Sequence, residues 1–270
     1  MNRFVETILT AGKVLLKSRK PGRASRDGDG KTLIVIGNGP SLRQTMAESG
    51  VAMRSHDTMA VNFAANTPEF LNLKPRHYIV ADPHFFTSGD PNVVRLWENI
   101  ARVDWPMTLH IPVKTDVPES VGRNPSVELR RFNMTPAEGY DAFCHLLFRH
   151  GLAMPRPRNV LIPAIMEGIR EGYREIFIVG ADHTWPHTLY VDDRNRVVTV
   201  QPHFYEDNKK ELDRVAEAYK GIHIHDVLGS MVVAFRSYHH IRRFADREGV
   251  SVYNATPGSL IDAFSRKSLP

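Results

Sequence analysis

The sequence predicts an α/β fold: a mostly parallel sheet with helices on both faces and an inserted β-hairpin flap. Two observations lead to this prediction. Short apolar runs alternate with helical patterns from residue 32 onward, and most runs end in glycine, amide or acidic residues followed by a turn. Strands that alternate with helices are joined by crossovers, which make neighbouring strands parallel. Ligands of such sheets bind at the carboxyl ends of the strands.

The first strand and the turn after it form the clearest element. Thr32–Gly37 is an aliphatic run that predicts a fully buried strand, and a helix is expected to start at Ser41. Pro40 and Ser41 suit a helix start, because Ser can cap a free N–H and Pro lacks one. Such a turn would leave N–H groups and the positive end of a helix dipole facing one spot, where phosphate binds well. Against the alternative of a purely structural turn, we expect nucleotide contacts from Gly37, Asn38, Gly39, Pro40 and Ser41.

Two common nucleotide-binding patterns are excluded at this turn. The dinucleotide fingerprint Gly-x-Gly-x-x-Gly needs a third glycine where Leu42 stands. A P-loop needs Gly-Lys-Ser or Gly-Lys-Thr, which does not follow.

The remaining elements continue the alternation. Further strands are expected at 58–62, 77–81, 107–111, 127–132, 175–180 and 250–254. Helices are expected at 41–49, 91–102, 137–150, 160–171, 206–220 and 230–248. Residues 188–200 break the pattern, because two β-rich runs flank the turn sequence Asp-Asp-Arg-Asn. We interpret them as a hairpin that projects from the sheet as a flap.

Length and composition fit one substantial core. The chain has 270 residues, of which 42% are hydrophobic. We divide it into a basic amphipathic segment with a linker, 1–31, and a nucleotide-binding catalytic domain, 32–270. The one cysteine, Cys144, excludes an internal disulfide and a cysteine-based zinc site. It lies in an apolar helical pattern, so we expect a buried thiol and a reducing, cytoplasmic setting.

Positive charge is concentrated at the N-terminus of a chain whose net charge is +5. Against the single acid Glu6, the basic residues before position 24 are Arg3, Lys13, Lys17, Arg19, Lys20 and Arg23. Helical periodicity places Phe4, Ile8, Leu15 and Leu16 near one face. This predicts either a peripheral helix on the anionic inner membrane or a helix that docks on the domain or frays. The segment is too short and too charged to span a bilayer, and no clear signal-peptide cleavage site follows.

No nucleic-acid partner is expected. Beyond residue 24 the basic residues are balanced by acids, and no basic stripe interleaved with aromatic residues occurs.

Polar residues follow four other predicted strands. Because the carboxyl ends of parallel strands lie at one edge, these residues would converge there with the first turn. We expect them to complete a nucleotide cleft; they are Asn62, Asp82, Gly180, Asp182, Pro257, Gly258 and Ser259.

Histidines and tyrosines cluster around the predicted flap. A histidine near a phosphate site can act as a general base, because its pKa lies close to neutrality, and a tyrosine hydroxyl can stabilise a departing phosphate. The candidates for these catalytic roles are His203, His183, Tyr205 and Tyr190. A zinc site formed by His183, His187, His203 and Asp182 is the weaker alternative, because the spacing is irregular and no cysteine takes part.

Three blocks resemble two linked protein groups. The blocks are Ile34–Leu42, Gly172–Asp182 and Val252–Leu260, and they span most of the chain. They resemble, in the same order, blocks of the bacterial sialyltransferases of glycosyltransferase family 42. They are also similar to the domain-of-unknown-function 115 group, which includes MptE-like 6-hydroxymethylpterin diphosphokinases and flagellin-associated motility accessory proteins.

The resemblance to the sialyltransferases implies a Rossmann-like domain, a flap, and a CMP-activated nonulosonic acid donor used without a metal. It implies that Asn38, Gly39, Ser41 and Asn62 face the donor, and that the nucleoside lies near Gly180, Asp182 and the Pro257–Ser259 turn. It also implies a histidine base after the Gly-x-Asp block, which His203 matches best and His183 second. Asp82 stands where that family has Asn. Asn159-Val160-Leu161 replaces its Thr-Ser-Gly segment, which leaves Kdo, legionaminic or pseudaminic acid as equal candidates for the sugar.

These observations favour glycosyl transfer from a CMP-sugar to a surface glycan or glycolipid acceptor, with no cofactor. The first alternative is pterin diphosphokinase activity with ATP and magnesium, for which the available ligands are Asp82, Asp182, Asp192 and Asp193. The second is a non-catalytic nucleotide-binding assembly protein. The sequence leaves a homo-oligomer open.

Overall fold

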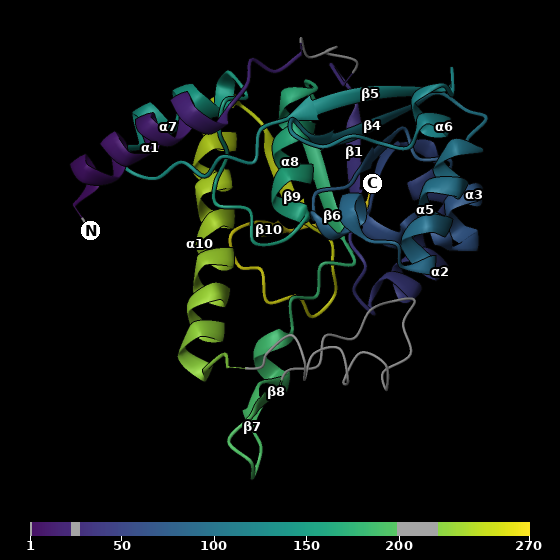
Figure 1. Cartoon of the computed structure of the whole chain (residues 1–270). Coiled ribbons are helices and arrows are strands. Elements are labelled where there is room, and N and C mark those ends of the chain that lie inside the picture. The colour runs from purple at the N-terminus through teal and green to yellow at the C-terminus, as the bar shows by residue number, and fades with distance from the viewer. Residues whose placement is uncertain (1, 23–27, 199–220) are drawn as a thin grey trace.

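Eight parallel strands form a single sheet in the order β10–β9–β6–β1–β2–β3–β4–β5 (Figure 1). The computed structural model describes residues 2–22, 28–198 and 221–270. The strands are β1 (Thr32–Ile36), β2 (Asp57–Val61), β3 (His77–Ile79), β4 (Met107–Pro112), β5 (Val127–Phe132), β6 (Glu175–Val179), β9 (Ser251–Asn254) and β10 (Ser265–Arg266). Every pairing in this sheet is parallel, which confirms the predicted α/β class.

Helices connect the strands and cover the sheet. They are α1 (Arg3–Lys17), α2 (Leu42–Ser55), η1 (Asn62–Asn66), α3 (Pro68–Leu73), α4 (His84–Thr87), α5 (Pro91–Ala101), α6 (Glu119–Gly122), α7 (Asp141–Arg149), α8 (Leu161–Arg170), η2 (Trp185–Thr188) and α10 (Ile224–Glu248). The predicted helix 206–220 lies outside the described residues.

Three helix boundaries differ from the sequence prediction for local reasons. The helix predicted from 137 begins at Asp141, because Gly139 adopts φ +124° in close contact with Thr7. The helix predicted from 230 begins at Ile224, where His223 and Asp226 form a capping box. The helix predicted over 41–49 continues to Ser55 across a break at Ser49.

Both faces of the sheet are buried, because alternate side chains point to opposite sides. On one face Leu33, Val35 and Ile176 pack in a core with α7, α8 and α10. On the other face Ile34 and Phe177 pack against α2, and the strands farther along pack against α3, α5 and α6. Cys144 is buried in the first of these cores, as expected.

The order of the strands reverses between β1 and β6. From β1 the chain builds β2, β3, β4 and β5 outward in one direction, and then returns to place β6 and β9 on the other side of β1. In open α/β sheets such a switch point is where the loops at the carboxyl ends diverge and a ligand can enter. The topology thus predicts a ligand site at the turns after β1 and β6.

The predicted flap is an antiparallel hairpin of β7 (Tyr190–Val191) and β8 (Val197–Val198), which extends away from the sheet (Figure 1). Asp192 shapes its turn by accepting the backbone N–H groups of Arg194 and Arg196. The root of the flap packs on α10, where Val197 is buried with Val227 and Met231. A helix from the far end of the chain therefore supports the flap.

Candidate functional site

The turns after β1 and β6 are clasped together by backbone hydrogen bonds. The N–H of Gly37 donates to the carbonyl of Val179, and the N–H of Gly39 donates to the carbonyl of Gly180, both at 2.8 Å. A side chain at position 37 would overlap the carbonyl of Gly180, whose own φ of +60° favours glycine. The glycines after both strands are thus required by the close approach of the two turns.

Asp182 occupies the N-terminus of α2. Its Oδ2 accepts the hydroxyl of Ser41 at 2.8 Å, and its Oδ1 accepts the N–H of Ser41 at 3.2 Å. A Cβ at Gly39 would overlap Oδ2 of Asp182. The chain's own carboxylate therefore lies where the sequence suggested a ligand phosphate. The expectation that this turn holds several free N–H groups is corrected: those of Gly37, Gly39 and Ser41 all have partners within the chain.

Asn62, at the end of the neighbouring strand β2, carries an unpartnered polar atom. Its Oδ1 is buried and has no hydrogen-bond partner among the described residues. Its backbone has φ +50°, in the left-handed region, and its carbonyl accepts the hydroxyl of Tyr78. Strained backbone and unsatisfied buried polar atoms are both concentrated at functional sites. Asn62 therefore offers a buried, unpartnered amide oxygen at the carboxyl end of β2.

A hollow of about 480 Å³ lies beside this edge of the sheet. It lies between the first half of α2 and the junction of η1 with α3; its lining residues are Arg43, Met46, Ala47, Asn66, Thr67, Pro68 and Glu69. Because α2 follows β1 and η1 follows β2, the hollow is reached from the carboxyl ends of these two strands. Arg43 contributes positive charge at the helix end that would attract an anion.

The loop after β9 braces the end of β6. Asn254 donates to the Ser259 hydroxyl at 3.0 Å, and Ser259 donates to the carbonyl of Ala181 at 2.6 Å. The N–H of Leu260 donates to the carbonyl of Asp182 at 2.9 Å. Ser259 is buried within this arrangement, whereas Pro257 and Gly258 are exposed. The loop therefore holds Asp182 in place and presents only its tip to solvent.

Asp82, after β3, is exposed and has a local role. Its Oδ1 accepts the N–H of His84 at 2.8 Å and so closes the turn that begins the short helix α4. The structure thus brings the turns containing Gly39, Asp182 and Ser259 into direct contact, with Asn62 on the adjacent strand.

His183 is buried in a polar group that sequence reasoning missed. Its Nε2 lies 2.7 Å from the hydroxyl of Tyr238, which donates to Oδ1 of Asn159 at 2.9 Å. Asn159 also accepts the N–H of Leu161 at the start of α8. In the sequence, Tyr238 lies 55 residues from His183 and 79 residues from Asn159, so no local pattern reveals these contacts.

Burial lowers the pKa of His183 to about 3, which keeps its imidazole neutral at physiological pH. The side chain is 7% exposed and contacts the ring of Trp185 in a tilted arrangement, with ring centroids 4.1 Å apart. A histidine of such low basicity and access suits a positioning role at the turn after Asp182 better than proton abstraction.

The other catalytic candidates lie on or beyond the flap. Tyr190 is exposed on β7. His203 and Tyr205 lie outside the described residues.

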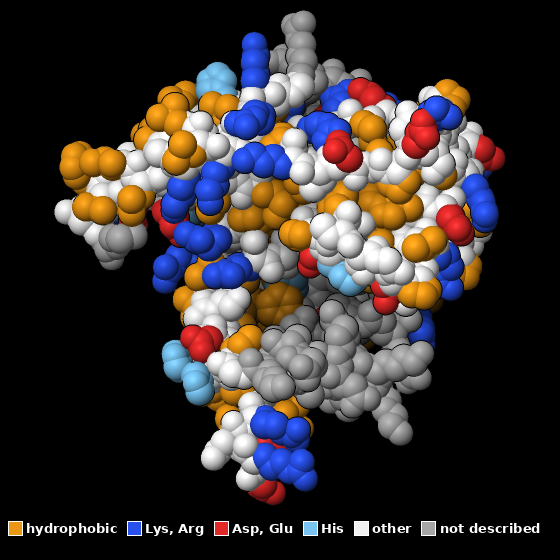
Figure 2. Space-filling view, in the orientation of Figure 1, with side chains coloured by type: hydrophobic (Ala, Val, Ile, Leu, Met, Phe, Trp, Pro, Cys, Tyr) orange, Lys and Arg blue, Asp and Glu red, His pale blue; other side chains and the backbone are white. Residues whose placement is uncertain are grey.

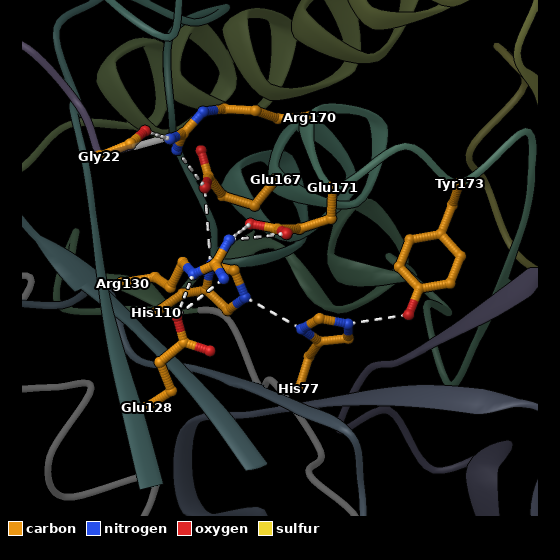
Figure 3. A network of polar contacts seen from close by, with 9 residues as sticks. All are labelled: Gly22, His77, His110, Glu128, Arg130, Glu167, Arg170, Glu171 and Tyr173. Atoms are coloured by element: carbon orange, nitrogen blue, oxygen red, sulfur yellow. Dashed lines mark hydrogen bonds and ion pairs between the residues drawn. The ribbon is translucent and has the colours of Figure 1, made fainter. Parts of the chain in front are cut away.

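A second polar cluster lies at the opposite, amino edge of the sheet (Figure 3). Tyr173, just before β6, donates to Asp57 at 2.7 Å and lies 2.8 Å from Nε2 of His77. His77 Nδ1 in turn lies 3.1 Å from Nε2 of His110, whose Nδ1 is 3.5 Å from Glu167. Burial, together with the neighbouring His110, lowers the pKa of His77 well below its usual value.

This cluster contains side chains that could ligate a cation. The ligand atoms of His110, Glu167 and Glu171 lie within 4.8 Å of one another, and all three residues are buried. However, Arg130 donates to both carboxylate oxygens of Glu171 at 3.0 Å, and Arg170 donates to Glu167 at 2.8 Å. Because the arginines already neutralise both carboxylates, the arrangement fits an internal ion-pair network better than a metal centre.

The four aspartates that the sequence suggested as magnesium ligands do not form a comparable cluster among the described residues. Asp182 is bound to Ser41, and Asp192 is bound to Arg196 at 2.8 Å. Within residues 2–22, 28–198 and 221–270, the group of carboxylates and histidines close enough to share an ion is the one at the amino edge.

Comparison with known proteins gives a likeness in structure and no match in sequence. No family model and no curated protein matches the chain. A solved structure, described as MAf glycosyltransferase from Magnetospirillum magneticum AMB-1, superposes with a TM-score of 0.54 at 11% sequence identity. The match covers 99% of this chain and 39% of that protein, so the chain spans well under half of its length. At this identity the likeness concerns the fold: the described sheet and its helices follow an architecture that is also present in a glycosyltransferase.

Proposed function

We propose that this protein is a glycosyltransferase that moves a nonulosonic acid or Kdo-type sugar from a CMP-sugar to a glycan or glycolipid acceptor. The observation that carries the proposal is the edge of the sheet at its switch point. There the clasped turns of Gly39 and Gly180 adjoin Asn62, whose buried amide oxygen has no partner among the described residues. The likeness in fold to a glycosyltransferase structure supports the same activity class.

We assign two kinds of role to the residues of this edge. Asn62 and the Pro257–Gly258 tip would contact the donor, because Oδ1 of Asn62 has no partner among the described residues and the tip is exposed. Asn38, which is half-buried in the turn after β1, would join them. A second set would hold those contacts in position through the bonds described above; it consists of Gly37, Gly39, Ser41, Gly180, Asp182 and Ser259. Pro40 would act with this set by fixing the backbone of the turn before Ser41. Arg43, in the adjacent hollow, would add positive charge near the CMP phosphate.

The proposed reaction is a direct displacement at the anomeric carbon of the sugar. The acceptor hydroxyl loses its proton to His203 as its oxygen bonds to that carbon, and the bond from the carbon to the CMP phosphate breaks. Tyr190 and Tyr205 would donate hydrogen bonds to the departing phosphate. We prefer His203 to His183 as the base, because burial lowers the pKa of His183 to about 3. In this scheme the hydrogen bonds stabilise the negative charge of the departing phosphate without a metal, and the reaction takes place in the cytoplasm.

A thermal-shift comparison tests the proposal. CMP, CDP, ATP and GTP are added separately, each with and without magnesium. We expect CMP and CDP to raise the melting temperature by several degrees at saturating concentration, because they bind the folded state only. If neither nucleotide changes the melting temperature at millimolar concentration, the proposal is wrong. A magnesium-dependent shift with ATP alone would support the diphosphokinase alternative.

A matched pair of variants tests whether CMP binds beside Asn62. Asn62→Ala should weaken CMP binding about tenfold, the effect of losing one hydrogen bond to a charged ligand. Asn72→Ala, which removes the same side chain from an exposed position on α3, should leave CMP binding unchanged. Equal affinity in the two variants would remove Asn62 from the proposed site.

A further inference from the structure

Helix α1 is strongly two-sided in composition. At about 100° per residue, six of its large apolar residues fall within an arc of roughly 140°, and the seventh, Val14, lies outside this arc and packs against the core. The residues of this arc are Phe4, Val5, Ile8, Leu9, Leu15 and Leu16. In a helix that covers a globular core, such an arc would face inward.

The face of α1 that contacts the rest of the protein is the face opposite the apolar arc. Thr10, the buried residue of this helix, exchanges hydrogen bonds with the backbone of Glu138 at 2.8 and 3.0 Å. Thr7 accepts the N–H of Tyr140 at 3.1 Å, and the absence of a side chain at Gly139 permits this close approach. After the helix, Ser18 donates to the carbonyl of Leu152 at 2.7 Å. Small polar side chains thus fix α1 beside the start of α7 (Figure 1).

The apolar arc is consequently left on the outside. All six of its residues are exposed, with Leu15 83% and Leu16 76% accessible. In Figure 2 hydrophobic side chains cover the outer end of this helix. Single exposed apolar residues are ordinary, but six on one face of one helix form a continuous patch that needs a partner.

Basic residues border the patch. Arg3, Lys17, Arg19 and Lys20 are exposed on or just after α1. Figure 2 shows Lys and Arg side chains gathered next to the patch on this side of the molecule. The acids on α1 and at or just before the start of α7 are Glu6, Glu138 and Asp141; Glu138 is held by Arg156 at 2.7 Å and by Lys13 at 3.9 Å, and Asp141 is held by Arg243 at 3.4 Å. The border of the patch is therefore positive.

We propose that α1 is a membrane-binding helix that lies in the headgroup region of an anionic phospholipid bilayer. Its apolar arc would enter the boundary with the acyl chains, and the basic border would contact the phosphates. No helix among the described residues is long and apolar enough to cross a bilayer. An apolar arc ringed by positive charge fits an anionic lipid surface better than a second copy of this chain, which would bring the same charges together.

This proposal does not depend on the proposed function, since it rests on the surface of α1 alone. If both hold, the helix would bring the candidate site to the surface where a glycolipid acceptor lies.

Vesicle co-sedimentation of the full chain tests the proposal. We expect the protein to bind vesicles of mixed phosphatidylglycerol and phosphatidylcholine, to bind phosphatidylcholine alone more weakly, and to lose the difference at high salt. The double variant Ile8→Glu/Leu15→Glu should lose binding at least about tenfold, because two charges replace inserted side chains. The variant Val51→Glu/Leu71→Glu changes two equally exposed apolar residues on α2 and α3 and should bind like the original chain.

Three outcomes would overturn the proposal. The original chain could fail to bind anionic vesicles, or both double variants could bind equally well. Alternatively, the chain could form dimers that Ile8→Glu/Leu15→Glu converts to monomers without any vesicle binding, which would identify a second copy as the occupant. Circular dichroism and the melting temperature should be the same for the original chain and the α1 variant, because the replaced side chains contact little of the protein.

Discussion

The carboxylate of Asp182 accepts hydrogen bonds from both the backbone N–H and the hydroxyl of Ser41 at the start of α2. Asp182 lies two residues after Gly180, the glycine that follows β6. Ser41 and Asp182 are 141 positions apart in the sequence. The contact joins the two strands at which the sheet reverses its order, and it places a negative charge at the positive end of a helix. The candidate site is therefore built around an internal anion that fixes its geometry.

Gly39→Ala should destabilise the fold, because its methyl group would collide with Oδ2 of Asp182 and the carbonyl of Gly180. We expect a loss of about 2–3 kcal/mol in the free energy of unfolding, measured by urea denaturation. Gly89→Ala is the matched control, since a Cβ there meets nothing within 4 Å. If the two variants were equally stable, the clasp between the two turns would be refuted.

His183 should make stability depend on pH. Its pKa is lowered to about 3 in the folded state, against an ordinary value of 6.5, so the unfolded chain binds the extra proton between these two limits. The stabilisation that comes from the neutral imidazole is fully present above about pH 6.5 and is lost as the pH falls toward 3. By pH 4 the free energy of unfolding should have fallen by about 3 kcal/mol through this effect.

Urea titrations at a series of pH values isolate this effect. His183→Asn removes the titrating group and keeps a side chain that tolerates the residue's φ of +52°, so its stability should fall less steeply with acid. Tyr238→Phe retains the imidazole and should retain the steep decline. Identical slopes in the original chain and His183→Asn would show that His183 is not buried in its neutral form.

Arg130→Met should leave the carboxylate of Glu171 buried without its partner. We expect the free energy of unfolding to fall by about 3–5 kcal/mol. The double variant Arg130→Met/Glu171→Met should regain much of this loss, because it removes both charges together. Arg123→Met breaks an exposed ion pair with Glu119 and should cost less than about 1 kcal/mol. A comparable cost for Arg123→Met and Arg130→Met would contradict the internal network.

The sequence predicted the sheet well because its central strands are buried on both faces. Runs such as Leu33–Ile36 and Ile176–Val179 carry apolar side chains on both faces, so they can be identified as buried strands without knowledge of their neighbours in the sheet. Short elements such as α3 and β10 were not predicted, because a few residues show no periodicity. The glycine turns were correctly predicted as special, but the reason differs: Gly39 accommodates the Asp182 side chain.

The finer features of the site could not be predicted because they are contacts between distant segments. Nothing near Asp182 reveals that it will cap α2, and nothing near Ser259 reveals that its hydroxyl is used by Ala181. The same holds for the group of His183, Tyr238 and Asn159. Sequence placed His183 in the correct loop but could not give its burial, which determines its pKa.

His203→Ala should separate binding from catalysis if His203 is the general base. The melting-temperature shift caused by CMP should persist, because the base contacts the acceptor hydroxyl and not the nucleotide, whereas turnover should fall by at least about a hundredfold. His187→Ala, which removes an exposed histidine just before the flap, should retain both properties. The measurement is release of CMP from a CMP-sugar in the presence of acceptor, with nucleotide binding followed in parallel. Undiminished turnover in His203→Ala would transfer the role of base to another group. Loss of the CMP-induced shift together with turnover would instead place His203 in the nucleotide site, where its proposed role would no longer hold.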